Sequence, residues 1–103
     1  MNFNIHSIKD ENSITQHVII EGDVGVNFID QVKMKIESIQ IDGREIIIDL
    51  KNIESFDISS VQLMYSLKKT LGDQGKSVEL KSEFPENIII LLRNSGFEEI
   101  INT

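Results

Sequence analysis

The chain has 103 residues with 17 acidic and 10 basic side chains, a net charge of −7, two histidines and no cysteine. This length is enough for one domain with a hydrophobic core of its own and too short for two. Because cysteine is absent, disulfides and thiolate chemistry are excluded, and two histidines are too few for a metal site built from histidine.

The charge balance indicates which partners the chain can bind. Phosphate groups are bound by Lys and Arg, so an acidic chain disfavours nucleic acid and anionic membranes and is compatible with a basic protein partner. The longest apolar runs have four or five residues, against about 20 needed to span a bilayer. No basic segment precedes an apolar stretch at the N-terminus, so we expect a cytoplasmic protein without membrane insertion.

The first half of the chain predicts two strands and one helix. Residues 3–8 alternate apolar and polar side chains, and residues 13–24 form a second strand region that ends at glycines. Asn27 is predicted to cap the helix that follows. Apolar residues on one face of that helix recur at spacings of four, four and three, at Phe28, Val32, Ile36 and Ile39.

The second half predicts two strands and two helices. Residues 45–50 contain three consecutive isoleucines, which favour a strand, and the unbroken apolar run predicts a strand covered on both faces. A helix with Val61, Met64, Leu67 and Leu71 on one face is expected from Ser59 to about Leu71, with a stop at 72–75. The remaining elements are a strand at 76–80, a helix at 84–96 with Pro85 in its first turn and Gly96 as its C-terminal cap, and a last turn or short strand at 97–101.

This alternation predicts an α/β fold. The order β-β-α-β-α-β-α implies a mixed, mostly parallel central sheet of four to five strands flanked by helices, with right-handed crossovers. We find no linker, repeat or low-complexity tract, so residues 1–103 are predicted to form a single domain.

No pattern in the sequence indicates an enzyme. Phosphate-binding glycine motifs and the G-x-S-x-G motif are absent, and the glycines at 21–25 and 72–75 are interpreted as turns. His6 and His17 fall on predicted strands, where they are interpreted as exposed residues rather than as bases for a serine nucleophile. We therefore predict no catalytic residues, no metal ligands and no cofactor.

The segment around Asp57 is predicted to begin the second helix. Ser59 followed by Gln62 matches a capping box, and Ile58 with Leu63 matches a hydrophobic staple around it. Asp57 would gain from the positive end of the helix dipole. These features explain the segment as a helix start without any function.

The same geometry also allows a functional interpretation. Ser59 and Ser60 would be exposed at a helix N-terminus, where backbone N–H groups favour negative charge. A phosphate on either serine would add about −1.5 to −2 charges to that surface. Binding would be lost if the partner were acidic or apolar at that point, so one modification could act as a switch.

From about Ile14 to Ile101 the chain resembles the STAS domain, the fold of bacterial anti-sigma factor antagonists. The resemblance rests on two segments. In EIIIDLKNIESFDISSVQLMYSLKKTLGDQGKSVEL, an apolar strand ends in Asp-Leu, a Phe-Asp pair precedes small residues that open a helix, and a glycine turn leads to a strand. In SEFPENIIILLRNSGFEEII, a helix closes on LLRNSGF before a short terminal element.

The resemblance implies a protein-binding function without enzymatic activity. Such domains bind histidine-kinase-like ATPases that act as serine kinases and otherwise hold sigma factors. The kinase phosphorylates the first hydroxyl after the aspartate of a D-S-[ST]-G motif, which ends binding, and a phosphatase restores it. The partner-binding residues implied here are Asp57, Ile58, Ser59, Ser60 and Gln62.

Two residues depart from that motif. Ile58 stands where the phosphoacceptor is expected, and Ser60 stands where the glycine is expected. The candidate phosphorylation sites are therefore Ser59 and Ser60. The alternative is a non-phosphorylated STAS adaptor in a chemosensory or other signalling complex, or in a lipid-transport assembly.

Overall fold

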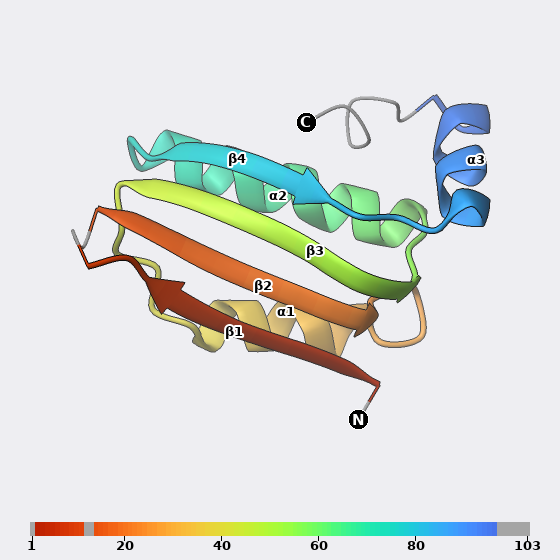
Figure 1. Cartoon of the computed structure of the whole chain (residues 1–103), viewed down its shortest axis with the longest axis horizontal. Helices are drawn as coiled ribbons and strands as arrows, with labels where there is room; N and C mark the ends of the chain where they lie inside the picture. Colours follow the sequence, from red (N-terminus) through yellow and green to blue (C-terminus); the bar gives the residue numbers. More distant parts are fainter. Residues whose placement is uncertain (1, 12–13, 97–103) are drawn as a thin grey trace.

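The computed structural model describes residues 2–11 and 14–96 and contains four strands and three helices (Figure 1). In chain order they are β1 (Phe3–Lys9), β2 (Thr15–Asp23), α1 (Ile29–Ser38), β3 (Glu45–Ser55), α2 (Ile58–Asp73), β4 (Ser77–Ser82) and α3 (Glu86–Asn94). This is the order predicted from the sequence. The predicted turn or strand at 97–101 lies outside the described residues.

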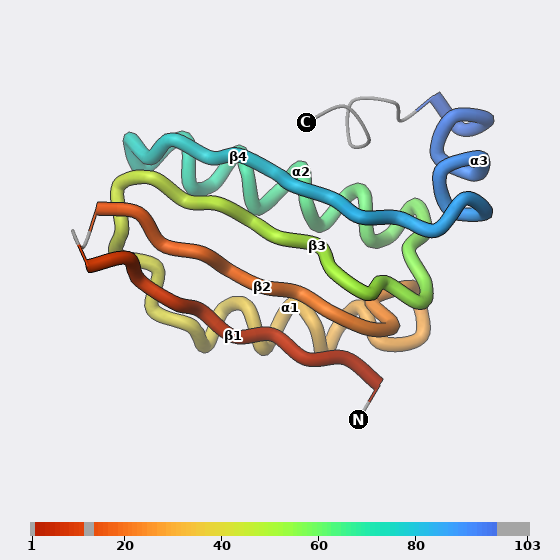
Figure 2. Tube along the Cα trace, in the orientation of Figure 1, coloured from red at the N-terminus to blue at the C-terminus, as the bar shows by residue number. Residues whose placement is uncertain are grey.

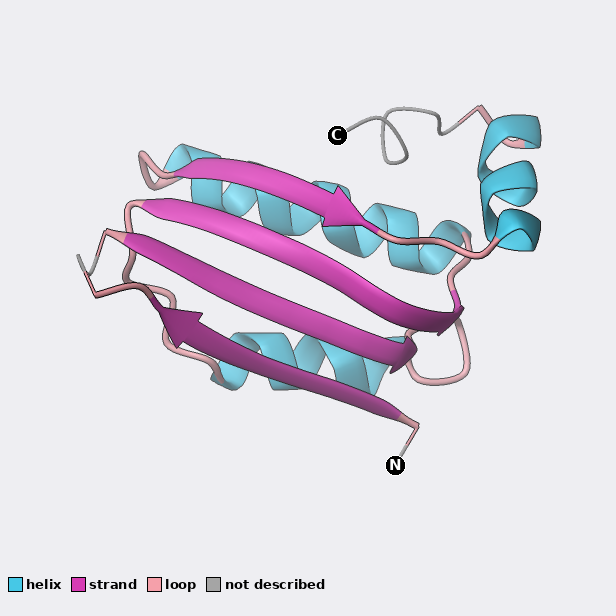
Figure 3. Ribbon diagram, viewed as in Figure 1, coloured by secondary structure: helices cyan, strands magenta, loops and turns pink. Residues whose placement is uncertain are grey.

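The strands form one mixed, mostly parallel sheet in the order β1-β2-β3-β4. β1 pairs antiparallel with β2, whereas β2, β3 and β4 run parallel to one another. The predicted α/β fold class is confirmed. Figure 3 shows α1 and α2 against the same face of the sheet, with α3 beyond the end of β4.

Because three strands are parallel, the sheet has two distinct ends. We call the end where β2, β3 and β4 finish the carboxyl edge; its described segments are 2–3, 23–31, 52–62 and 82–90. We call the end where these strands begin the amino edge; its described segments are 9–11, 14–16, 38–46 and 68–77. All three helices start at the carboxyl edge (Figure 1).

The core lies between the sheet and the two helices on its covered face. In β3, Ile46, Ile48 and Leu50 are each 1% exposed, whereas Ile47 and Asp49 between them are only partly buried. The prediction that β3 is covered on both faces is therefore wrong. Both crossover helices lie on one side of the sheet, so the isoleucine run reflects β propensity rather than burial on two faces.

The predicted apolar stripes of the helices are confirmed. Val32 and Ile36 of α1 are buried, as are Val61, Met64 and Leu71 of α2. Phe28, Ile39 and Leu67 are partly buried against the same core.

The helix ends are only partly as predicted. Gly75 and Gly96 adopt positive φ angles of 82° and 81° just past α2 and α3, which confirms them as helix stops. Asn27 does not cap α1; the N-cap position is Phe28, without a side-chain hydrogen bond. Pro85 is the N-cap residue of α3 and precedes its first turn.

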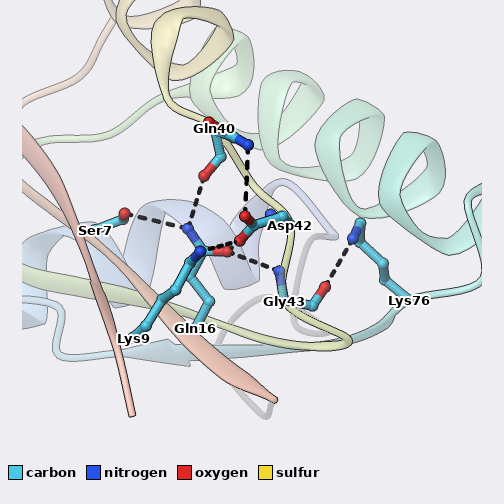
Figure 4. Close-up of polar contacts among 7 residues, drawn as sticks. All are labelled: Ser7, Lys9, Gln16, Gln40, Asp42, Gly43 and Lys76. Carbon is cyan, nitrogen blue, oxygen red and sulfur yellow. Dashed lines mark hydrogen bonds and ion pairs between the residues drawn. The ribbon is translucent and has the colours of Figure 1, made fainter. Parts of the chain in front are cut away.

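A fully buried glutamine organises the amino edge (Figure 4). The side-chain Nε2 of Gln16 donates to Ser7 Oγ at 3.2 Å and to Gln40 O at 2.9 Å. Its Oε1 accepts from Asp42 N at 3.1 Å and Gly43 N at 3.0 Å. Gln16 therefore ties β1 and β2 to the loop that leads into β3, and its own polar atoms are satisfied in the interior.

Two lysines make further contacts to the same loop. Lys9 Nζ lies 2.5 Å from Asp42 Oδ1, and Lys76 Nζ donates to Gly43 O at 2.7 Å. The hydrogen bond from Lys9 lowers the pKa of the Asp42 carboxyl below its ordinary value. A Cβ atom on Gly43 would lie 2.9 Å from Gln16 Cβ, so the close packing of this edge requires glycine there.

Candidate functional site

Helix α2 begins at the carboxyl edge with Asp57 as its N-cap residue. Asp57 has an extended backbone, with φ −132° and ψ −167°, and its Oδ1 accepts from Ser59 N at 3.0 Å and Ser60 N at 3.3 Å. In return, the Ser60 hydroxyl accepts from Asp57 N at 3.1 Å. The helix start is thus a capping box made by Asp57 and Ser60.

The predicted capping box of Ser59 with Gln62 is wrong, and so is the predicted staple of Ile58 with Leu63. The helix begins two residues earlier than those pairs require. The positions that flank the true cap are Phe56 and Val61, which are 2% and 0% exposed. Ile58 is instead 54% exposed.

Contacts outside the helix explain why Asp57, and not Ser59, is the N-cap residue of α2. Asp57 Oδ2 accepts from Val26 N at 2.7 Å, in the loop between β2 and α1. The Ser60 hydroxyl donates to Val24 O at 2.6 Å. A helix that began at Ser59 would lose both bonds, so the preceding loop selects between two local sequences that could each cap a helix.

Asp57 therefore joins two loops from different parts of the chain. Figure 2 shows the β2–α1 loop passing beside the segment that leads from β3 into α2. Gly25 permits this approach, because an added Cβ would lie 2.7 Å from Ser55 Oγ and 2.9 Å from Asp57 Oδ2. The Asp23 carboxylate accepts from Gly25 N at 3.1 Å and holds the loop from its other side.

The two serines at the helix start differ in accessibility. Ser60 is 1% exposed and its hydroxyl is engaged with Val24 and Asp57. The expectation that both serines are exposed is therefore wrong for Ser60, whose role here is structural. Ser59 is only partly buried, and its hydroxyl has no hydrogen-bond partner within residues 2–11 and 14–96.

The five predicted site residues thus fall into two groups, accessible residues and residues that hold the helix start. Ile58, Ser59 and Gln62 lie at the accessible start of α2, whereas Asp57 and Ser60 hold that start in place. Sequence reasoning missed Val26, which is 62% exposed and bonded to Asp57. The rule that loops following parallel strands meet at one edge of the sheet could have found it.

The arrangement favours contact over chemical reaction. Both oxygens of Asp57 are engaged by backbone amides. His17 lies away from this edge, within 3.3 Å of Asp10 and 3.5 Å of Asp49, and His6 is on β1. Within residues 2–11 and 14–96, no group of three or more His, Cys, Asp or Glu side chains is placed to hold a metal ion.

The chain belongs to the STAS domain family, whose model matches residues 11–103. A solved structure of the anti-sigma factor antagonist SpoIIAA in its unphosphorylated form is similar, with a TM-score of 0.61 and 17% identity over 94% of this chain and 83% of that one. The STAS domain of an antisigma-factor antagonist from Rhodobacter sphaeroides matches with a TM-score of 0.56 and 17% identity, over 78% and 84%. At this identity the likeness is one of fold. No match was found among curated proteins.

The family match and the likeness of fold thus agree that this chain is a STAS domain. No helix in the described part of the chain is long and apolar enough to cross a membrane.

Proposed function

We propose that this chain is an anti-sigma factor antagonist that acts in the cytoplasm by partner switching with a serine-kinase-type anti-sigma factor. The observation that carries the proposal is the accessible start of α2, where Ile58, Ser59 and Gln62 are presented on a helix held by the Asp57 cap. Family membership and the two structural relatives, both described as antisigma factor antagonists, support it.

In this proposal the residues around the helix start have two roles. Ile58, Ser59 and Gln62 contact the partner directly. Asp57 and Ser60 position them, because Asp57 caps the helix and Ser60 bonds to the neighbouring loop. Disruption of either positioning residue would weaken binding through a loss of geometry.

We further propose Ser59 as the phosphorylation site. Ser59 is only partly buried, whereas a kinase could reach Ser60 only after the helix start had opened and the bond to Val24 had broken. A phosphate on Ser59 would lie beside the Asp57 carboxylate, which already occupies the free amides of the first turn. The added charge would repel Asp57 and disturb the docking surface.

A binding and phosphorylation assay with a histidine-kinase-like ATPase tests this function. We expect the unmodified chain to bind the kinase, and Mg-ATP to add one phosphate that is absent in Ser59→Ala and present in a folded Ser60→Ala variant. The phosphorylated chain should no longer bind. Absence of any complex with the kinase would contradict the function, and a complex without phosphate would contradict only the switch.

One observation favours a second candidate function, a non-phosphorylated adaptor in a signalling complex or lipid-transport assembly. Ile58 follows Asp57 directly, at the position that carries the acceptor hydroxyl in the family motif, and it is exposed as an apolar contact. An adaptor would bind its partner permanently. Intact-mass measurement of protein taken from cells separates the candidates, since stoichiometric phosphoserine would contradict the adaptor.

A further inference from the structure

We infer that the partner of this chain presents a basic surface with an apolar recess, and that the recess receives Val26 and Ile58 together. The inference rests on the proposed docking at the start of α2 and specifies the chemistry of the surface that docks there. It also adds Val26, from a separate loop, to the contact.

The centre of the surface is a pair of exposed apolar side chains. Val26 is 62% exposed and Ile58 is 54% exposed. A single exposed apolar residue is ordinary on a protein surface. These two come from different loops, and both loops are joined at Asp57, which accepts a hydrogen bond from Val26 N and directly precedes Ile58.

The charged residues nearest to this pair along the chain are all acidic. The carboxyl-edge segments contain no Lys, Arg or His, and their acidic residues are Asp23, Asp30, Glu54, Asp57, Glu83 and Glu86. The ion pairs found within residues 2–11 and 14–96 all lie elsewhere. Lys33, in the second turn of α1, is the first basic residue beyond these segments on that helix. A partner that covers the apolar pair therefore meets carboxylates that are not paired with any basic side chain of the carboxyl-edge segments.

Charge complementarity identifies the occupant. An acidic partner would be repelled, and a purely apolar one would cover carboxylates without replacing their hydration. Lys and Arg around an apolar recess would satisfy both features, because contacts with an apolar centre and a polar rim are the usual anatomy of a protein interface.

The surface is also formed in advance of binding. The Asp57 cap, the bond from Ser60 to Val24 O and the close approach at Gly25 fix both loops in the free chain. A partner would not have to order these loops when it binds, which favours affinity.

Nuclear magnetic resonance titration with three synthetic helical peptides tests the inference on the intact chain. The first peptide is amphipathic with Leu and Lys, the second has Glu in place of Lys, and the third has Ser in place of Leu. We expect the Leu/Lys peptide to shift the amide signals of Val26 and Ile58, and the other two to leave them unchanged. Shifts centred on the amino edge or the open sheet face would overturn the inference, as would equal binding of the Leu/Glu peptide.

Variants separate the apolar and charged contributions. The double variant Val26→Ser, Ile58→Ser should weaken binding of the Leu/Lys peptide by about tenfold or more. The control Met34→Ser, at a residue 69% exposed on α1, should not weaken it.

The charged contribution is tested in the same way. Asp30→Lys should weaken binding of this peptide more than Asp73→Lys, which makes the same charge change at the far end of α2. Raising the ionic strength from about 0.1 M to about 1 M shortens the Debye length from about 10 Å to about 3 Å and should also weaken binding. Equal effects of each variant and its control would contradict the inference.

The kinase-type ATPase distinguishes this inference from the proposed function. If the kinase binds and the Val26→Ser, Ile58→Ser double variant binds it equally well, the inference fails and the function stands. If the Leu/Lys peptide binds at Val26 and Ile58 but the kinase does not bind, the function fails and the surface chemistry stands.

Discussion

The two edges of the sheet are built from the same kinds of loop and differ in how their polar groups are used. At the amino edge, the side chain of Gln16 makes hydrogen bonds to β1 and to the loop before β3, and Lys9 and Lys76 bind the same loop. Basic residues there, Lys9, Arg44, Lys68, Lys69 and Lys76, balance the acidic residues Asp10, Glu11, Asp42, Glu45 and Asp73. In the carboxyl-edge segments the charged residues are all acidic, and three large apolar side chains are exposed, those of Val26, Ile58 and Ile90.

This difference separates stability from binding. The amino edge satisfies its buried polar groups internally, so its residues should matter mainly for folding. The carboxyl edge uses Asp57 and Ser60 to hold a surface with exposed apolar side chains, and its segments contain no basic side chain to pair with their carboxylates. Its exposed residues should matter mainly for binding.

The largest expected effect is at the amino edge. Gln16→Leu removes both ends of the buried amide and leaves Gly43 N without a partner, so the free energy of unfolding should fall by about 2–4 kcal/mol. Urea denaturation measures this change, with exposed Gln62→Leu as the control. Binding of the Leu/Lys peptide to the folded fraction should be unchanged; a stable Gln16→Leu protein would contradict the structural role of this residue.

Three glycine substitutions compare the edges more directly. Gly43→Ala should cost about 1–3 kcal/mol, because its Cβ meets Gln16 Cβ at 2.9 Å and Ile14 O at 3.1 Å. Gly25→Ala should cost less, since the ends of the Ser55 and Asp57 side chains can move, but it should weaken peptide binding. Gly72→Ala meets no atom within 4 Å and should stabilise α2 by about 0.5 kcal/mol. Thermal melts measure the changes in stability, and the peptide titration measures the change in binding. A larger loss of stability for Gly25→Ala than for Gly43→Ala would contradict this comparison.

The cap of α2 provides the next comparison. Asp57→Ala should lower the free energy of unfolding by about 0.5–2 kcal/mol through loss of the N-cap, and it should weaken peptide binding because Val26 N loses its acceptor. Ser59→Ala should change stability by less than about 0.5 kcal/mol. If chemical denaturation gives an equal loss in the free energy of unfolding for the two variants, Asp57 does not stabilise α2 as its N-cap residue.

The smallest effect concerns the pH dependence of the amino edge. The hydrogen bond from Lys9 lowers the pKa of Asp42 below its ordinary value of 3.8. The stabilisation from this pair is therefore present above the unfolded pKa and is lost as the pH falls through the folded one. Lys9→Met should raise the pKa of Asp42 in a carboxyl-carbon titration, and an unchanged titration would show that Lys9 is not the cause.

Much of the fold could be predicted from the sequence, because local patterns determine it. Apolar residues such as Val32 and Ile36 recur at helical spacing, and glycines at 75 and 96 mark helix ends. The isoleucines of β3 predicted a strand correctly but not which face is covered. That depends on where the crossover helices pack, which no local pattern records.

The site was harder to predict because two caps overlap in one short segment. Asp57 with Ser60 and Ser59 with Gln62 both fit a capping pattern, and bonds to Val24 and Val26 decide between them. Those residues lie more than 30 positions away in sequence, as the separations of 31 and 36 indicate. The network of Gln16 was missed for the same reason, since a lone glutamine in a strand gives no signal of burial.

Hydrogen–deuterium exchange of the chain alone and bound to the kinase-type ATPase tests the central claim most directly. If the carboxyl edge is the docking surface, backbone amides in 24–28 and 57–62 should exchange more slowly in the complex, and those in 38–46 should be unchanged. Slower exchange at 38–46, with no change at 24–28 and 57–62, would contradict the assignment of binding to the carboxyl edge.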